Sequence, residues 1–228
     1  MLGQFPPVFF VGVVVFVIAM AILAHQRQRR RRQEFMALAG RMGLHYTDQV
    51  SGETLRRHYA PLELFERGDS RRARHLLTGS INGREVMACA FQYTVRSSGK
   101  NNTSTTYHRG MAMLKLDLSV PRVLIRRENW GDKLAGWVGL EDIDFESDQF
   151  SREYYVKCAD RQFAYKLIDP RMMEFILGEG DLQWEVCDGW VGAWREDELD
   201  PDEVADLLTA LAGFCKNVPR LVEKEYAP

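Results

Sequence analysis

The chain has 228 residues, of which 46% are hydrophobic and 27% are charged, and its formal net charge is -2. This composition excludes a wholly disordered chain and a multispan membrane protein, and the length favours one well-buried domain over two. Residues 1–74 hold 12 Lys and Arg against 6 Asp and Glu, which leaves 18 against 26 for the rest. The sequence therefore predicts that the basic part of the chain meets lipid.

An uncharged run, FPPVFFVGVVVFVIAMAILA, covers residues 5–24 and matches the roughly 20 residues with which a helix crosses a hydrocarbon core. The two prolines at its start suit a first helical turn, so we expect a transmembrane helix over residues 8–24. A cleaved secretory signal is the alternative, because Ala19-Met20-Ala21 is a small-x-small pattern. It is disfavoured because no Lys or Arg precedes the run and several arginines follow it.

An arginine cluster follows the apolar run directly. Because Lys and Arg beside a span resist translocation, the cluster predicts a single-pass signal-anchor in a bacterial inner membrane, with the N-terminus outside and the following domain in the cytoplasm. Its charge would also attract anionic headgroups, by about 1 kcal/mol per basic residue near the surface. The cluster consists of Arg27, Arg29, Arg30, Arg31 and Arg32.

The predicted organisation has four parts along the chain. They are a short extracytoplasmic N-terminus (1–7), the transmembrane helix (8–24), a basic juxtamembrane segment (25–33) and a cytoplasmic α+β domain (34–228). The cysteines of that domain show no CxxC pair and no histidine at ligand spacing, so we expect buried, reduced thiols rather than a zinc site. They are Cys89, Cys158, Cys187 and Cys215.

Helical spacing of apolar residues predicts one helix over residues 33–42 and a second over 52–65, which Pro61 must bend or split. An Asp-Pro pair starts each of two further helices, over residues 169–178 and from Asp200 to about Lys216. In the second of these, an acid three residues after the cap completes a capping box. An apolar stripe predicts that this closing helix packs on the sheet. The stripe consists of Val204, Leu207, Leu208, Leu211 and Phe214.

Strand patterns dominate residues 75–127, where Asn82-Gly83 signals a tight hairpin and the alternation predicts a meander of roughly four antiparallel strands. Further extended segments are expected over residues 153–158 and 162–168, and a last hairpin turns at Asp188-Gly189. The predicted fold class is α+β, with an antiparallel sheet of about six to eight strands covered by helices.

Residues 150–173 read FSREYYVKCADRQFAYKLIDPRMM. This block resembles one found in an uncharacterised family of bacterial single-span membrane-anchored proteins with a domain of unknown function. The resemblance extends through the soluble domain and implies an apolar anchor and basic residues in front of it. It implies no activity. The residues themselves agree, since Phe163, Tyr165, Met172 and Met173 suit a core better than a site.

The densest polar pattern begins at Glu141. Five acids there have the spacing of positions 1, 3, 5, 7 and 12 of a calcium loop, and hard cations prefer clustered carboxylate oxygens. However, Ser147 stands where the loop needs Gly, and Tyr154-Tyr155-Val156 favours a strand over the helix that should follow. Alternation on an exposed strand is the simpler interpretation, so no metal is assigned. The five candidates are Asp142, Asp144, Glu146, Asp148 and Glu153.

No catalytic residue is assigned, because the chain has no HExxH, GxSxG or GxxxxGK[ST] motif and its five histidines occur singly. No cofactor is expected, and nucleic acid is disfavoured because no known module is visible. We therefore predict a membrane-tethered, non-catalytic binding or regulatory module. Its expected partners are the lipid bilayer, through anionic headgroups, and an unidentified protein or a second copy. The alternative is a membrane-anchored hydrolase or metal-dependent enzyme that uses dispersed carboxylates.

Overall fold

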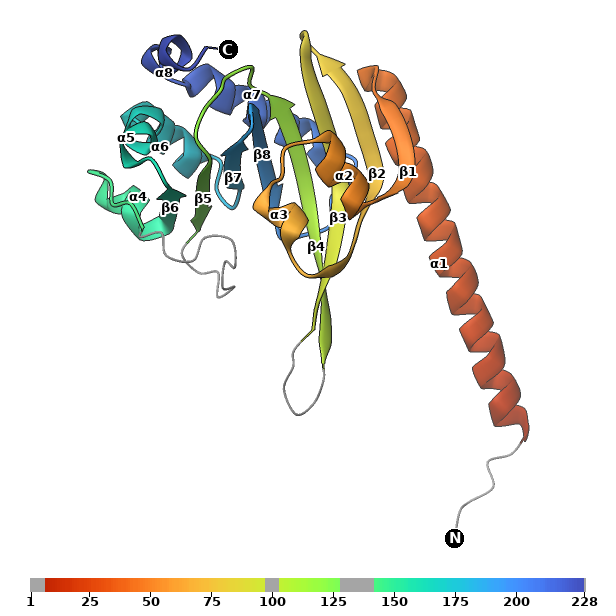
Figure 1. The fold of residues 1–228 in the computed structure, drawn as a ribbon. Helices are drawn as coiled ribbons and strands as arrows, with labels where there is room; N and C mark the ends of the chain where they lie inside the picture. The colour runs from red at the N-terminus through yellow and green to blue at the C-terminus, as the bar shows by residue number, and fades with distance from the viewer. Residues whose placement is uncertain (1–6, 97–102, 128–141, 228) are drawn as a thin grey trace.

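The computed structural model describes residues 7–96, 103–127 and 142–227, with side chains from residue 12 onward. Its centre is an eight-stranded sheet in the order β1-β2-β3-β4-β8-β7-β5-β6, and all neighbours are antiparallel (Figure 1). The predicted α+β class and sheet of six to eight strands are therefore confirmed. The strands are β1 (His45–Ser51), β2 (Asp69–Ile81), β3 (Arg84–Arg96), β4 (Ser104–Lys115), β5 (Val123–Arg127), β6 (Tyr154–Cys158), β7 (Gln183–Cys187) and β8 (Trp190–Arg195).

Helices cover the two faces of the sheet unequally (Figure 1). The C-terminal end of α1 and helices α4 to α8 contribute to the larger apolar core, whereas among the described helices α2 and α3 alone contribute to the core on the opposite face. The helices are α1 (Pro7–Met42), α2 (Gly52–His58), α3 (Glu63–Glu66), α4 (Asp148–Glu153), α5 (Arg161–Leu167), α6 (Pro170–Gly178), α7 (Glu203–Asn217) and α8 (Arg220–Glu225).

Most helices and hairpins form where the sequence predicts them, because turn and capping residues fix the local backbone. Asn82 and Gly83 both have positive φ, at 52° and 80°, which is the backbone that a two-residue hairpin requires. The Asp169 side chain accepts a hydrogen bond from Met172 N at 2.9 Å and caps α6. The predicted stripe of α7 is buried throughout. Its helix starts at Glu203, whose carboxylate accepts from the backbone N–H of Asp200.

Three strand predictions are wrong. The segment predicted as a strand over residues 162–168 instead lies in α5 (Arg161–Leu167) and its C-cap, because Asp160 caps Phe163 N and the buried side chains follow helical spacing. Residues 142–147 are not a strand. They contact the sheet edge at Val156, whose O accepts from the Ile143 N–H and whose N–H donates to Asp142 Oδ1. The four-strand meander fails at β5, because β8 and β7 lie between β4 and β5.

The predicted transmembrane helix is also wrong. No helix among the described residues is long and apolar enough to cross a membrane. The helix that holds the predicted span, α1, does not end at Ala24 but continues through the arginines to Met42, so the apolar run is part of a longer and partly charged helix. The predictions of a single-pass signal-anchor and of an inner-membrane protein with a cytoplasmic domain depend on this span, so they are wrong as well. The predicted boundaries at residues 24 and 33 fall inside this one helix.

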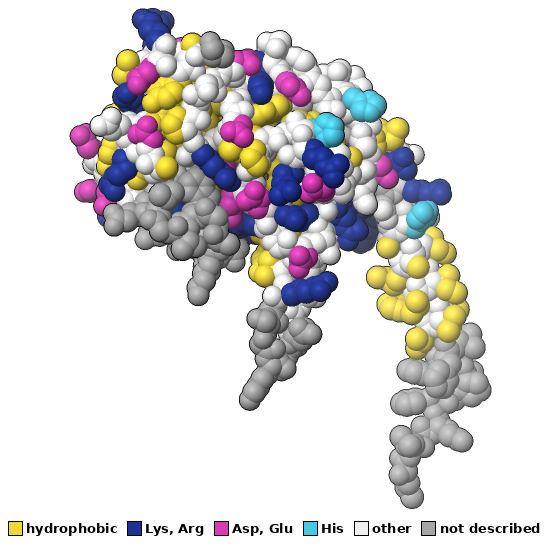
Figure 2. Space-filling view, in the orientation of Figure 1, with side chains coloured by type: hydrophobic (Ala, Val, Ile, Leu, Met, Phe, Trp, Pro, Cys, Tyr) yellow, Lys and Arg dark blue, Asp and Glu magenta, His cyan; other side chains and the backbone are white. Residues whose placement is uncertain are grey.

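The C-terminal part of α1 packs on the sheet, whereas the side chains from Val13 to Leu23 lie exposed along the helix (Figure 2). Phe35, which is fully buried, stacks on the His75 ring with 4.4 Å between centroids and 4° between planes. His75 Nδ1 lies 3.0 Å from the Tyr46 hydroxyl. These contacts connect α1, β1 and β2 through one histidine ring.

We expect His75 to titrate below the ordinary histidine range. Burial, with the positive charges of Arg74 and Arg31, lowers its pKa from 6.5. The folded state then binds fewer protons than the unfolded state just below pH 6.5, so this contribution to stability is lost as the pH falls through that range. An NMR titration of the ring protons measures the pKa, with His75→Asn used for assignment. A midpoint at or above 6.5 contradicts the expectation.

Candidate functional site

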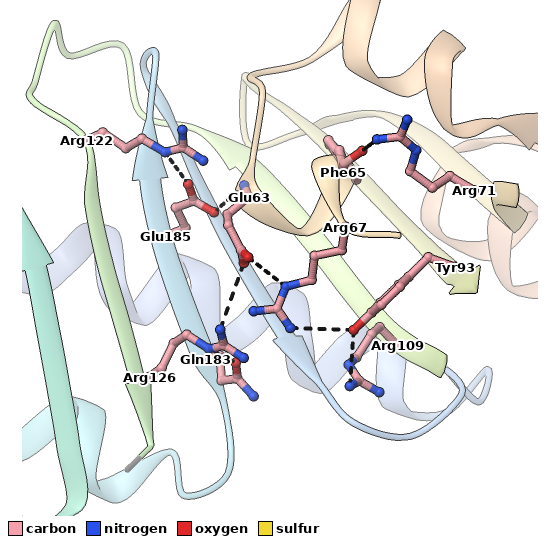
Figure 3. A network of polar contacts seen from close by, with 10 residues as sticks. All are labelled: Glu63, Phe65, Arg67, Arg71, Tyr93, Arg109, Arg122, Arg126, Gln183 and Glu185. Carbon is pink, nitrogen blue, oxygen red and sulfur yellow. Dashed lines mark hydrogen bonds and ion pairs between the residues drawn. The ribbon is translucent and has the colours of Figure 1, made fainter. Parts of the chain in front are cut away.

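A network of charged side chains lies between α3 and the sheet, on the face opposite α7 (Figure 3). Most of its members are buried, although the strands around them are apolar. We call it the α3 cluster. It consists of Glu63 from α3, Arg67 directly after α3, Tyr93 from β3, Arg109 from β4, Arg122 before β5, Arg126 from β5, and Gln183 and Glu185 from β7.

Glu185 is the most enclosed carboxylate of the α3 cluster, with no exposed surface. Its Oε2 accepts from the backbone N–H of Glu63 at 2.9 Å, and its Oε1 accepts from Arg122 Nε at 2.5 Å. Burial raises the pKa of Glu185 to about 7, although the Arg122 guanidinium and the Glu63 N–H oppose this shift. Glu185, on a strand of the sheet, therefore provides the hydrogen-bond acceptor for a backbone N–H in the first turn of α3.

Glu63 makes the reciprocal connection from α3 down to the sheet. Its Oε1 accepts from Arg67 Nε at 2.7 Å, and both side chains are less than a tenth exposed. Its Oε2 lies 4.0 Å from Arg126 Nη1, while Arg126 Nε donates to Gln183 Oε1 at 2.8 Å. Two carboxylates thus hold the short helix α3 on the sheet. Glu63 belongs to α3 itself, and Glu185 belongs to strand β7.

The Tyr93 hydroxyl lies at the other end of the α3 cluster, between two arginines (Figure 3). Arg67 Nη1 and Arg109 Nη2 are each 3.5 Å from it. Arg109 Nη1 also donates to the carbonyl oxygens of His108, at 2.7 Å, and Glu196, at 3.1 Å. These contacts extend the α3 cluster to the loop after β8.

The geometry of the α3 cluster favours a structural role over a reactive one. A carboxyl with a pKa near 7 has the property that general acid–base catalysis needs. Such a group must also reach a substrate proton, at about 2.6–3.2 Å. Glu185 instead has both oxygens engaged by the protein and no exposed surface. Buried charged groups that are mutually hydrogen-bonded strongly penalise the loss of any one member.

The fold resembles that of the crystal structure of the mycobacterial trehalose monomycolate transport factor A, TtfA. The TM-score is 0.61 and the sequence identity is 14%, and the likeness covers 84% of this chain and 96% of that chain. At this identity the likeness concerns the fold alone. No family model matches the chain, and no curated protein matches it by sequence. The resemblance of residues 150–173 to a family of anchored bacterial proteins stays a prediction.

The predicted arginine cluster is divided by the structure. Arg31 is bound to the segment before α7, since its Nη2 donates to Leu199 O at 2.7 Å and lies 3.1 Å from Asp200 Oδ1. Arg30 pairs with Glu34, and Arg32 lies 3.7 Å from Asp48. Part of the positive charge therefore fixes α1 to the domain. The predicted contact of Arg27, Arg29 and the others with anionic headgroups stays a prediction.

The five predicted cation ligands have different environments. Asp142 Oδ1 accepts from the backbone N–H groups of Ile143 and Val156, at 2.9 and 2.7 Å. Glu153 ends α4 and pairs with Arg127 at 2.8 Å. Within the described residues, which include Asp144, Glu146 and Asp148, no group of three or more His, Cys, Asp or Glu is placed to hold a metal ion. Asp142 therefore bonds the edge strand β6, and Glu153 forms an ion pair at the end of α4.

Sequence reasoning did not single out the α3 cluster. The available signal was the placement of polar residues at alternate positions of otherwise apolar strands, as in Gln183 and Glu185 of QWEVC. A strand buried on both faces normally reads as a continuous apolar run. Charged residues on such a strand therefore indicate partners from another element, but the sequence does not name them.

Proposed function

We propose that this chain is a non-catalytic binding module associated with transport, which acts through a partner protein. The observation that carries the proposal is the likeness of the fold to a transport factor, which covers 96% of that chain. A shared fold does not by itself imply a shared function. The proposal gains support from the α3 cluster, because its carboxylates are engaged in holding α3.

The experiment is complementation of a strain that lacks the chain. We expect the deletion to shift at least one molecule between the cells and their surroundings, as measured by mass spectrometry of both fractions. Compared at equal amounts of folded protein, wild type and Glu185→Gln should restore the distribution equally, because Gln removes the carboxyl that acid–base catalysis would need but keeps the volume and one hydrogen-bond acceptor. Glu66→Gln, on the exposed side of α3, is the matched control.

Two outcomes contradict the proposal, and they are distinguishable. An unchanged distribution after deletion rules out the transport role. A folded Glu185→Gln protein that restores function about 100-fold less well than wild type indicates acid–base catalysis, because removal of a catalytic acid or base typically has an effect of that size. Reciprocal purification of the chain and one transport protein would identify the partner.

A further inference from the structure

A groove on the α7 side of the sheet has the composition of a small-molecule site. Its volume is about 350 Å³, within the range of ligand pockets. The groove lies between the β2–β3 hairpin, the end of β4 and helices α7 and α8. Its apolar lining includes Ile81, Val86, Leu114, Leu208, Ala212 and Cys215.

Charged side chains border this apolar lining. Arg84 and Lys216 are the cations and Glu223 is the anion, so the charged lining residues sum to +1. Among the described residues none of the three takes part in an ion pair, whereas Arg67, Arg122 and Arg127 each lie within 4.0 Å of a carboxylate. A guanidinium and an ammonium beside an apolar surface are suited to a monoanionic head, because charge-assisted hydrogen bonds are stronger than neutral ones.

We propose that this groove binds a single-chain amphiphile with a monoanionic head, of the class of medium-chain fatty acid carboxylates. The alkyl chain lies over Leu114, Leu208 and Ala212, and the carboxylate lies between Arg84 and Lys216. The volume equals that of roughly a dozen water molecules at about 30 Å³ each, which suits one short chain and excludes a large lipid. The site is separate from the α3 cluster, and it does not depend on the transport role.

Cys215 provides a local readout of occupancy. It is partly exposed and lines the groove, whereas Cys89, Cys158 and Cys187 are buried. Burial raises the pKa of the Cys215 thiol to about 11, so alkylation at neutral pH is slow and can be followed over time. A ligand in the groove must cover this sulfur. Alkylation measured by mass spectrometry therefore reports binding here and not elsewhere on the exposed apolar surface.

The experiment uses the full chain and sodium dodecanoate below its micellar concentration. We expect dodecanoate to slow Cys215 alkylation at least tenfold, in a saturable way. Ala212→Trp should abolish this protection, because the indole occupies the groove. Ala205→Trp is the matched control, since Ala205 lies on the same helix but lines a different pocket, with Ala37 and Leu38 of α1.

A second variant tests the head group and keeps the groove open. Lys216 is exposed at the end of α7, so Lys216→Gln should leave the fold intact. It should weaken dodecanoate binding roughly two- to fivefold and leave dodecanol binding unchanged, as expected for one exposed charge pair. The proposal is overturned by the absence of protection, by equal protection in a folded Ala212→Trp protein, or by equal weakening of both ligands in Lys216→Gln.

Discussion

Replacing Glu63 by Ala is expected to lower the free energy of unfolding by roughly 3–5 kcal/mol, the range found when one partner of a buried ion pair is removed. The substitution deletes the acceptor of Arg67 Nε and a carboxylate oxygen 4.0 Å from Arg126 Nη1, while leaving both guanidinium groups beneath α3. The loss exceeds the net value of the pair, because the remaining charges keep their desolvation cost. Denaturant unfolding of the variant measures it.

Glu66→Ala is the control for this prediction. Glu66 lies on the same short helix but is exposed, so its removal should change the free energy of unfolding by only tenths of a kcal/mol. If the free energy of unfolding of Glu63→Ala lay within about 1 kcal/mol of the wild-type value, Glu63 would not be needed to compensate the buried positive charges of the α3 cluster.

Replacing Leu211 by Ala should lower the free energy of unfolding by about 2–5 kcal/mol, the usual range for a buried leucine. Leu211 is fully buried on the sheet side of α7, in the larger core. The cost combines lost transfer free energy with the cavity that remains. Leu208 is 7% exposed and borders a groove, so Leu208→Ala should fall at the low end of the range.

The matched control on α7 is Thr209→Ala, because Thr209 is exposed and its hydroxyl bonds only the Ala205 carbonyl among described residues. The midpoint of denaturant unfolding should be close to that of wild type. If Leu211→Ala also left the midpoint unchanged, α7 would not be docked on the sheet as observed.

Elements with local chemical signals were predictable from sequence. Asn82-Gly83 requires positive φ at both residues, and Asp169-Pro170 supplies a cap and a compatible first turn, so neighbours in the chain decide these structures. The α5 helix was missed for the opposite reason. Its aromatic residues Phe163 and Tyr165 are common in strands, whereas the Asp160 cap and the burial of Phe163 and Leu167 on one side decide the helix.

The α3 cluster could not be predicted because sequence pattern does not specify strand order. Glu63 and Glu185 are 122 positions apart, and Arg126 meets Gln183 only because β7 enters the sheet beside β5. The insertion of β8 and β7 between β4 and β5 brings these residues under α3. A long-range crossover of this kind leaves no local periodicity.

Amide hydrogen exchange at Glu63 tests most directly the claim that the α3 cluster exists to hold α3 on the sheet. The Glu63 N–H donates to Glu185 Oε2 at 2.9 Å and should be protected in the wild-type protein. In Glu185→Ala we predict that protection at Glu63 and Phe65 falls at least tenfold beyond any change at Ala112, in the β4–β8 ladder. Equal loss at Ala112, or unchanged protection at Glu63, would contradict the account.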